Sequence, residues 1–274
     1  MKIVWQLLII ILFSFIFSSP FAVQKNKTYS HALYTNKKLL VGEELTYVVK
    51  YSLIKLGEVR LKIESKDTVK GKIYYNATAF IDSYSGIPFV NLHQIYQTKI
   101  NEDSASSFFR GLVRNDTYTT FTDYNFDYHD STIKIKKGKV YPHEIWLDST
   151  TTADKNYQDG LSIFYYARLN TGQVKNENIP CFVNEKKVFT KINYYNEVSD
   201  VSIDVVDYDI ACVKLEGYTD FVSVFGLTGH FEGWFSDDEA AIPVVASMRV
   251  IIGNITLELI SWKREGWTPP KYDM

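Results

Sequence analysis

The sequence has few cysteines, almost no net charge and none of the short motifs of common enzymes. Two cysteines in 274 residues are too few for a disulfide scaffold. Thirty Lys and Arg side chains against 32 Asp and Glu give a net charge of -2, which excludes the basic surface typical of nucleic-acid binding. The phosphate-binding motif G-x-x-x-x-G-K-[ST], the dinucleotide motif G-x-G-x-x-G and the nucleophile motif G-x-S-x-G are also absent from the sequence.

Apolar and aromatic residues are abundant. Hydrophobic residues make up 46% of the chain, aromatic residues 15% and charged residues 23%. This balance is typical of a globular protein with a core and excludes a disordered or collagen-like chain. Because aromatic residues favour strands, we expect a mainly β fold. At about 150 residues per domain, the length allows one large domain or two small ones.

The N-terminal residues have the pattern of a secretory signal peptide. Lys2 precedes an apolar run at 3–17, a small and turn-prone stretch ends at Ala22, and a polar segment follows at 24–27. This order predicts a signal peptide at 1–22. The alternative is an uncleaved anchor, although a membrane span needs about 20 apolar residues. We expect an exported bacterial protein, periplasmic or secreted, that is not an integral membrane protein after cleavage.

Export changes the interpretation of Cys181 and Cys212. Two thiols form a disulfide readily in an oxidising compartment, and a disulfide between these two cysteines would close a long loop. The residues around Cys212 alternate as in a strand, which favours a small buried side chain. We expect two buried thiols, with a disulfide as the alternative.

Alternation of apolar and polar residues predicts strands along most of the chain. In the first, at 45–51, Leu45, Tyr47, Val49 and Tyr51 share the drier face. The further predicted strands are 59–64, 72–82, 92–101, 107–113, 117–128, 132–136, 139–146, 187–196, 201–207, 210–218, 230–235 and 243–263. Long antiparallel meanders form curved sheets, so we expect a barrel, a half-barrel or a sandwich.

Glycine-containing segments predict turns between these strands. A turn is expected at 55–57, and the segment 136–139 is expected to be a hairpin turn. The last predicted strand has a possible hinge at Gly253 and Asn254, which would divide it into two strands.

The segment 159–168 has helical periodicity instead. Leu161, Phe164, Tyr165 and Arg168 recur at helical spacing, and Asp159 is available as an N-terminal cap. This short helix divides an N-terminal β half from a C-terminal β half. Since no linker or repeat separates the halves, we expect a polar lead-in at 23–40, a single β-rich domain at 41–263 and a C-terminal tail at 264–274.

Two groups of titratable residues are candidates for chemistry. His129 lies beside Asp130, as a general base and its orienting carboxylate would. Adjacent strand residues point to opposite faces, however, so we do not expect them to meet and interpret them as a solvated strand end. The carboxylates at 237–239 suit calcium binding or acid–base chemistry, but Pro243 after them favours a polar hairpin turn. We predict no catalytic residue, no cofactor and no metal site.

Aromatic side chains give the remaining signal. Tyr124, Phe126 and Tyr128 share one face of a predicted strand, with further aromatic residues at 108–109 and 164–166. Most of these side chains belong in a core. A curved sheet face lined by aromatic rings also suits an apolar ligand or a sugar.

Three stretches, in their order and spacing, resemble one family. They are 41–47 with 56–59, similar to an opening G-E-x-L-x-Y strand and its return; 159–168, similar to a D-x-L-S-x-x-Y-x-x-R helix; and 233–239 with Pro243 and 253–259, similar to a closing W-x-S-D-D segment and final strand. The family is the bacterial exported-protein family known as domain of unknown function 3108.

The resemblance implies an exported, mainly β protein, and it carries no established reaction or catalytic residue. The matched residues have structural interpretations: Arg168 is expected to pair with a buried acid, and Trp234 to anchor the core.

Together these observations favour a non-enzymatic envelope protein that binds a lipid, a glycan or an outer-membrane protein partner on an aromatic-rich sheet face. The alternative is a carboxylate-dependent hydrolase acting on envelope polymers, with Asp237 and Asp238 as its acids.

Overall fold

The computed structural model describes most of the chain. The described residues are 37–87, 91–101, 103–223, 226–250 and 253–273. The predicted signal peptide at 1–22 and most of the lead-in at 23–40 lie outside them.

Fourteen strands form one antiparallel sheet in this part of the chain. A single helix, α1 (Ser162–Leu169), follows the eighth strand. The strands are β1 (Glu44–Tyr51), β2 (Ile54–Val69), β3 (Lys72–Ser83), β4 (His93–Asn101), β5 (Ser106–Arg114), β6 (Thr119–Asp127), β7 (Thr132–Lys139), β8 (Glu144–Thr152), β9 (Lys175–Val183), β10 (Lys186–Val201), β11 (Ile210–Thr219), β12 (Leu227–Ser236), β13 (Pro243–Val250) and β14 (Gly253–Lys263).

The sheet is an open meander. Its order is β8 back to β1, then β14 back to β9, so β8 and β9 are the edges. Every ladder joins strands that are consecutive in the chain, except the ladder between β1 and β14, which pairs Glu44 with Lys263 and Lys50 with Thr256. The prediction of a mainly β fold, with a long curved antiparallel sheet and one short helix, is confirmed, and the half-barrel is the architecture that describes it.

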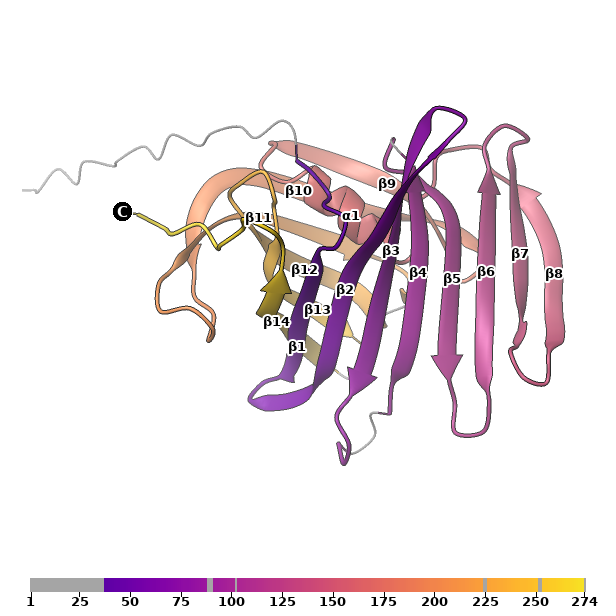
Figure 1. Cartoon of the computed structure of the whole chain (residues 1–274), viewed down its shortest axis with the longest axis horizontal. Coiled ribbons are helices and arrows are strands. Elements are labelled where there is room, and N and C mark those ends of the chain that lie inside the picture. Colours follow the sequence, from indigo (N-terminus) through magenta and orange to yellow (C-terminus); the bar gives the residue numbers. More distant parts are fainter. Residues whose placement is uncertain (1–36, 88–90, 102, 224–225, 251–252, 274) are drawn as a thin grey trace, which may run out of the picture. The chain divides into compact units, whose positions relative to one another are not determined.

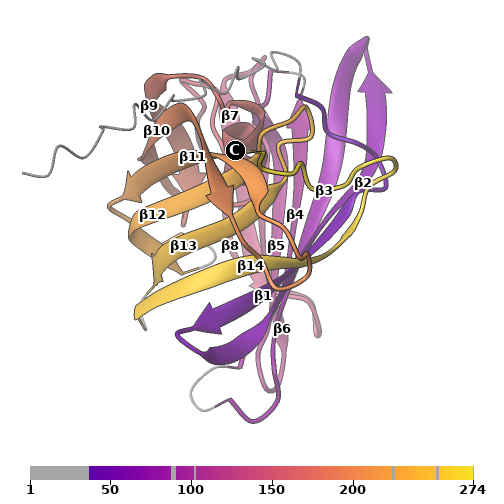
Figure 2. The ribbon, with the colours of Figure 1, turned by 90° about the vertical axis from the view of Figure 1, so that its left-hand side faces the viewer.

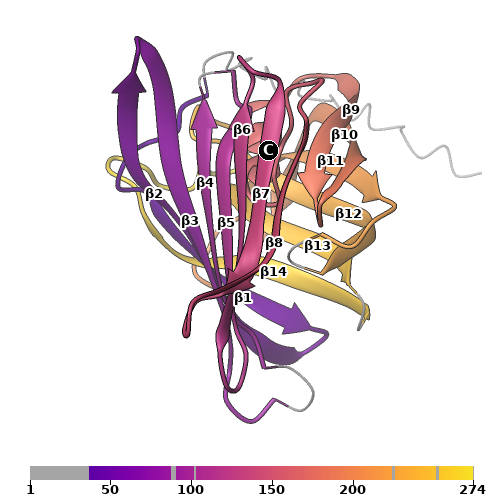
Figure 3. The same ribbon diagram turned by 90° about the vertical axis from the view of Figure 1, so that its right-hand side faces the viewer.

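The sheet curves so that its two sides face each other (Figures 1, 2 and 3). Strands β2 to β8 form one side and β9 to β13 the other, and the sides join along β1 and β14. Helix α1 lies between them. Leu161 and Tyr165 pack in a cluster with side chains of β3 to β7, whereas Ala167 packs with Ile179 of β9 and Val213 of β11. The helix therefore holds the two sides at a fixed separation.

Two predicted turns lie elsewhere in the structure. The turn predicted at 55–57 is at Ser52 and Leu53, and Gly57 lies within β2. A Cβ at Gly57 would lie 2.2 Å from the Asp82 carbonyl oxygen, so glycine here permits a close approach of β3 and is not a turn residue.

The hairpin predicted at 136–139 is wrong for a similar reason. Strand β7 continues to Lys139, with an irregular register at Lys137 and Gly138, and the chain turns at 140–143 instead. A Cβ at Gly138 would lie 1.9 Å from the Glu144 carbonyl oxygen, so this glycine also serves a close approach of two strands.

The segment predicted as a tail packs against the sheet. The Trp267 ring meets the Trp262 ring edge-on, with 5.4 Å between centroids. The Ala211 amide donates to the Pro270 carbonyl oxygen at 2.8 Å, and the Tyr272 amide to the Asp209 carbonyl oxygen at 2.8 Å. Through these bonds the C-terminal segment pairs with the start of β11, where Ile210 forms an isolated antiparallel bridge with Lys271.

Candidate functional site

A cavity of about 400 Å³ lies between helix α1 and the concave face of the sheet. Its walls come from β1, β2 and β3 on one side and from β9 to β14 on the other. A volume of this size is within the range of about 300–1,000 Å³ typical of small-molecule sites. The sheet curvature thus produces an interior space that a flat sheet would not have.

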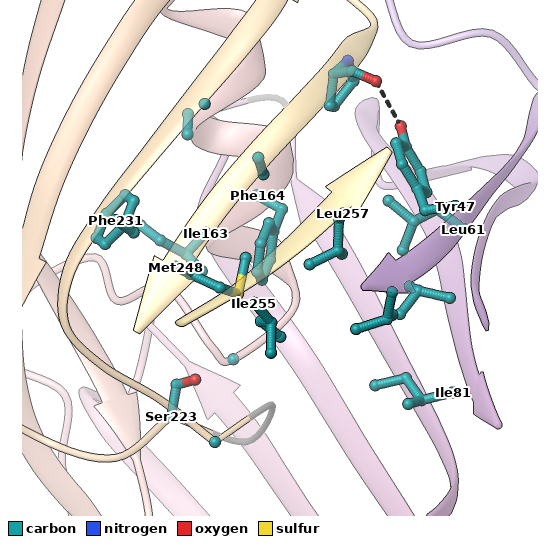
Figure 4. A pocket seen from close by; sticks show the side chains of 18 of the residues that line it. Tyr47, Leu61, Ile81, Ile163, Phe164, Ser223, Phe231, Met248, Ile255 and Leu257 are labelled. Atoms are coloured by element: carbon teal, nitrogen blue, oxygen red, sulfur yellow. Dashed lines mark hydrogen bonds between the residues drawn. The ribbon is translucent and has the colours of Figure 1, made fainter. Parts of the chain in front are cut away.

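The strand walls are apolar and mostly aliphatic, with Tyr47, Phe231 and Phe235 as their aromatic members. Leu45, Tyr47 and Val49 of β1 line the cavity, which is the face that the sequence alternation predicts to be dry. The adjacent strand β14 contributes the branched side chains of Ile255 and Leu257, and Leu257 pairs with Val49 in the ladder (Figure 4). Successive cavity residues are two apart because alternate strand residues share a face.

Helix α1 supplies the wall that covers the cavity. Ile163 and Phe164 line it, and Figure 4 shows them lying toward Met248 of β13 and Ile255 of β14. The Tyr47 hydroxyl donates to the Pro243 carbonyl oxygen at 2.9 Å, so its polar atom is satisfied within the wall.

A buried carboxylate anchors the N-terminus of α1. One oxygen of Asp159 accepts the amides of Leu161 and Ser162 at 2.7 and 2.8 Å, as the predicted cap requires. The other oxygen accepts the hydroxyls of Thr98 and Ser106 at 2.5 and 2.6 Å. Burial raises the pKa of the Asp159 carboxyl against the effect of these four donors. The helix start is thereby tied to β4 and β5.

A buried ion pair anchors the other end of α1. The Arg168 guanidinium donates to both oxygens of Glu43, at 2.5 and 2.8 Å, and to the Ala240 carbonyl oxygen at 2.9 Å. Arg264 also donates to Glu43. Burial by itself raises the pKa of Glu43. The two guanidinium groups lower this pKa by more than burial raises it, so the net pKa is below its usual value. The expectation that Arg168 pairs with a buried acid is confirmed.

Other charged residues of the cavity wall also have partners. Glu58 accepts the Tyr84 hydroxyl at 2.7 Å, and Asp82 lies 2.8 Å from the His93 ring nitrogen. Lys214 lies 2.6 Å from Glu232. Because the charges of the wall are held in these bonds, the surface offered to a ligand is apolar.

The aromatic face predicted as a binding surface is instead a filled core. Tyr124 and Phe126 are buried, and their rings lie 5.0 and 6.1 Å from the ring of Phe182 on β9. The Tyr128 hydroxyl donates to the Ser106 carbonyl oxygen at 2.7 Å. Curvature of the sheet brings β9 onto this face and fills it. The cavity lies beside this cluster and is lined mostly by aliphatic side chains.

His129 and Asp130 do meet, contrary to prediction. They lie in the turn between β6 and β7, where the rule for adjacent strand residues does not apply. The His129 ring nitrogen is 2.7 Å from the Asp130 carboxylate, and this bond raises the pKa of His129. Both side chains are exposed and neither lines the cavity, so the interpretation of a solvated strand end is kept.

The carboxylates at 237–239 form the turn between β12 and β13 that the sequence favours. One oxygen of Asp238 accepts the Ser236 hydroxyl and the amides of Ala240 and Ala241 at 2.8–2.9 Å. Its other oxygen accepts the Trp267 ring N–H at 2.7 Å. Asp238 is therefore engaged in holding the turn and the C-terminal segment.

Sequence reasoning missed one cluster of possible metal ligands. Glu216, His230 and Glu232 offer ligand atoms within 4.8 Å of one another across β11 and β12. His230 and Glu232 are two apart on one strand, a spacing that could have been noticed, but Glu216 comes from another strand. The Lys214 ammonium lies 2.6 Å from Glu232 and 3.6 Å from Glu216, so both carboxylates already have a cationic partner.

Cys181 and Cys212 are free and buried, which confirms the favoured prediction. They belong to separate clusters of the core. Burial raises the pKa of the Cys181 thiol to about 12 and also raises that of Cys212. Neither side chain is a thiolate at neutral pH.

Residues 46–260 match the model of a family described as a protein of unknown function, DUF3108. The chain belongs to this family. The family resemblance rests on three stretches of sequence, and the structure joins all three at α1 of this DUF3108 protein. Glu43 from the first stretch pairs with Arg168 from the second, and Arg168 donates to Ala240, directly after the third.

The solved structures that the DUF3108 chain matches include the following two. A beta-barrel-like protein of the domain of unknown function DUF1849 from Brucella abortus is 14% identical, with 85% of this chain and 99% of that chain covered and a TM-score of 0.46. A "putative lipoprotein" from Parabacteroides distasonis is 10% identical, with 82% and 96% covered and a TM-score of 0.33. No curated protein matches the sequence. Among the residues that the structure describes, no helix is both long and apolar enough to cross a membrane.

Proposed function

We propose that this protein binds the acyl chain of an envelope lipid in the cavity beneath α1 and performs no chemistry on it. The observation that carries the proposal is the apolar wall, which surrounds about 400 Å³ of space and whose charged residues are held in bonds within the fold. Each buried methylene contributes about 0.8 kcal/mol, so ten methylenes contribute about 8 kcal/mol before the entropy of binding is subtracted.

The same wall argues against a glycan in the cavity. A sugar needs hydrogen-bond partners for its hydroxyls, and polar groups left unpaired on burial are costly. Tyr47 and Asp159 already donate or accept within the fold. The methylene groups of an acyl chain need no hydrogen-bond partner.

The proposed location is outside the cytoplasm, in the periplasm or the surrounding medium. Its support is the sequence pattern at 1–22, where a basic residue, an apolar run and a small-residue segment follow in order. A protein in that compartment meets envelope lipids in water, where a single exposed acyl chain requires an apolar carrier.

A cavity-filling substitution tests the proposal. Ala246 of β13 lines the cavity, so Ala246→Trp places a large ring in the space that the ligand would occupy. Val174 is 73% exposed and does not line the cavity, so Val174→Trp is the matched control. Binding of a fluorescent fatty acid and its displacement by palmitate are measured on delipidated protein.

We expect saturable binding by the wild type and by Val174→Trp, and an affinity at least about ten-fold weaker in Ala246→Trp. Circular dichroism and urea unfolding verify that both variants are folded. A wild type that binds no fatty acid would refute the proposal, as would an Ala246→Trp variant that binds as tightly as the control. Organic extraction of protein purified from its own envelope adds a direct readout, because it should release a lipid at fixed stoichiometry.

A further inference from the structure

The tip of the β1–β2 hairpin exposes large apolar side chains. Leu53 is 96% exposed and Ile54 is 56% exposed. Two-residue hairpin turns normally carry glycine, asparagine or aspartate, and a leucine at the tip gains nothing from its own fold. A single exposed leucine is common on proteins, so its meaning depends on what lies next to it.

An apolar path connects this tip with the cavity. Val49 of β1 and Leu56 of β2 line the cavity on either side of the turn. Tyr51 follows Val49 on the same face and pairs with Ile54 in the ladder. The side chains of the hairpin thus run from the cavity wall to the exposed tip without a charged residue on that face.

The hairpin tip lies at the end of the cavity away from the Arg168 anchor. Strand β1 begins beside Glu43, which holds Arg168, and reaches Tyr51 about 26 Å farther along at about 3.3 Å per residue. At this end the cavity wall also includes Leu92, which precedes β4 and is half-exposed. At this end of the cavity, both the β1–β2 hairpin and the loop before β4 therefore present apolar side chains.

We propose that the β1–β2 hairpin inserts its tip into a lipid bilayer and so places this end of the cavity at the membrane surface. This inference rests on the proposed acyl-chain ligand, because the membrane is then both the source and the destination of that ligand.

The geometry fits a bilayer better than a protein partner. A stable protein interface needs a surface of about 800 Å² on each partner, with matching shape. The tip is a single projecting turn, which presents little area to a folded protein but can enter a fluid apolar layer. Lys55 is the nearest charge in sequence, so attraction to anionic lipid makes only a small contribution.

Vesicle flotation with paired variants tests this inference. The exported form of the protein is used, and its N-terminus is read by mass spectrometry. Leu53→Asp removes the apolar tip, and Val174→Asp makes the same change at another exposed position. With phosphatidylethanolamine and phosphatidylglycerol vesicles, we expect the wild type and Val174→Asp to float. The vesicle-bound fraction of Leu53→Asp should be at least about ten-fold lower than that of the wild type.

A local probe reports insertion directly. Because Cys181 and Cys212 are buried, Leu53→Cys and Val174→Cys can each be labelled at the new thiol with a polarity-sensitive fluorophore on the folded protein. We expect the label at position 53, and not that at 174, to brighten with vesicles and to be quenched by lipids brominated in their acyl chains.

The outcomes separate this inference from the proposed function. Leu53→Asp should bind a soluble fluorescent fatty acid as the wild type does; loss of flotation with intact binding supports hairpin docking. Flotation of Leu53→Asp equal to that of the control, or binding only to native membranes that have kept their proteins, would overturn docking and leave the cavity proposal standing. Flotation without fatty-acid binding by the wild type would instead overturn the cavity proposal.

Discussion

Replacing the carboxylate of Glu43 is the most direct test of how α1 is held over the cavity. Glu43 and Arg168 are each only 2% exposed, and Glu43 accepts hydrogen bonds from both Arg168 and Arg264. Glu43→Gln keeps the size of the side chain and removes its charge. The variant leaves a buried guanidinium group without a counter-charge.

The expected loss of stability is large. Removing one partner of a buried ion pair destabilises a protein by about 3–5 kcal/mol. For a chain of this size, 1 kcal/mol shifts the melting temperature by about 2–4 °C, so the melting temperature should fall by about 6–20 °C. Urea unfolding followed by circular dichroism measures the free energy of unfolding directly.

The pH dependence gives a second readout. The net pKa of Glu43 is lowered in the folded protein, because the effect of Arg168 and Arg264 outweighs that of burial. The ionised carboxylate therefore stabilises the fold above its unfolded pKa of about 4.3, and this stability is lost as the pH falls through the folded value. The difference in unfolding free energy between wild type and Glu43→Gln should narrow as the pH is lowered from 6 toward 3.

Two comparisons make the prediction refutable. Glu44→Gln changes the neighbouring residue, whose pair with Arg60 is solvent-exposed at 3.4 Å, and should alter stability by less than about 1 kcal/mol. Adding Arg168→Met to Glu43→Gln removes the uncompensated charge of Arg168, so the double variant should lose less than the sum of the single losses. A Glu43→Gln loss below about 1 kcal/mol, or strict additivity, would show that the pair does not hold the helix.

Three other outcomes follow from the same structure. Asp159→Ala strips four buried donors of their acceptor and should lower the free energy of urea unfolding by about 3 kcal/mol or more; a loss under 1 kcal/mol contradicts this anchoring role. Cys181 and Cys212 should resist a thiol reagent in the folded protein and both react in urea, whereas rapid labelling of the native state would contradict their burial. Gly57→Ala should destabilise by about 1–3 kcal/mol in a thermal melt, because its Cβ meets the Asp82 carbonyl, and an unchanged melt would exclude that clash.

Much of the fold could be predicted from local sequence. The alternation at 45–51 predicts both β1 and the residues that face the cavity, because apolar residues at every second position of a strand mark its buried face. The spacing at 159–168 predicts α1 and its buried Arg168 for the same reason. Strand β9 was missed because its first half, Lys175–Asn178, is polar and Pro180 interrupts it, which only an edge strand tolerates.

The site itself could not be predicted from local patterns. Phe164 and Met248 are far apart in sequence, and nothing in their periodicity distinguishes a side chain that fills a core from one that borders a space. The same limit applies to Tyr124, whose position suggests a binding face until Phe182 of the opposite side is known to cover it. The partner of Arg168 lies 125 residues away, so only the need for an acid was predictable.

The order of strands in the sheet also determines when the cavity comes into existence. As the chain folds, β1 to β8 and β9 to β13 can each form by local hairpins, because those ladders join consecutive strands. The wall that includes Ile255 and Leu257 arrives last, and it bonds to the first strand made. A chain that stops before β14 has both sides of the sheet but lacks the strand that joins them and completes the cavity wall. Ligand binding would therefore report completed folding, because a chain without β14 has no complete cavity in which to bind the lipid.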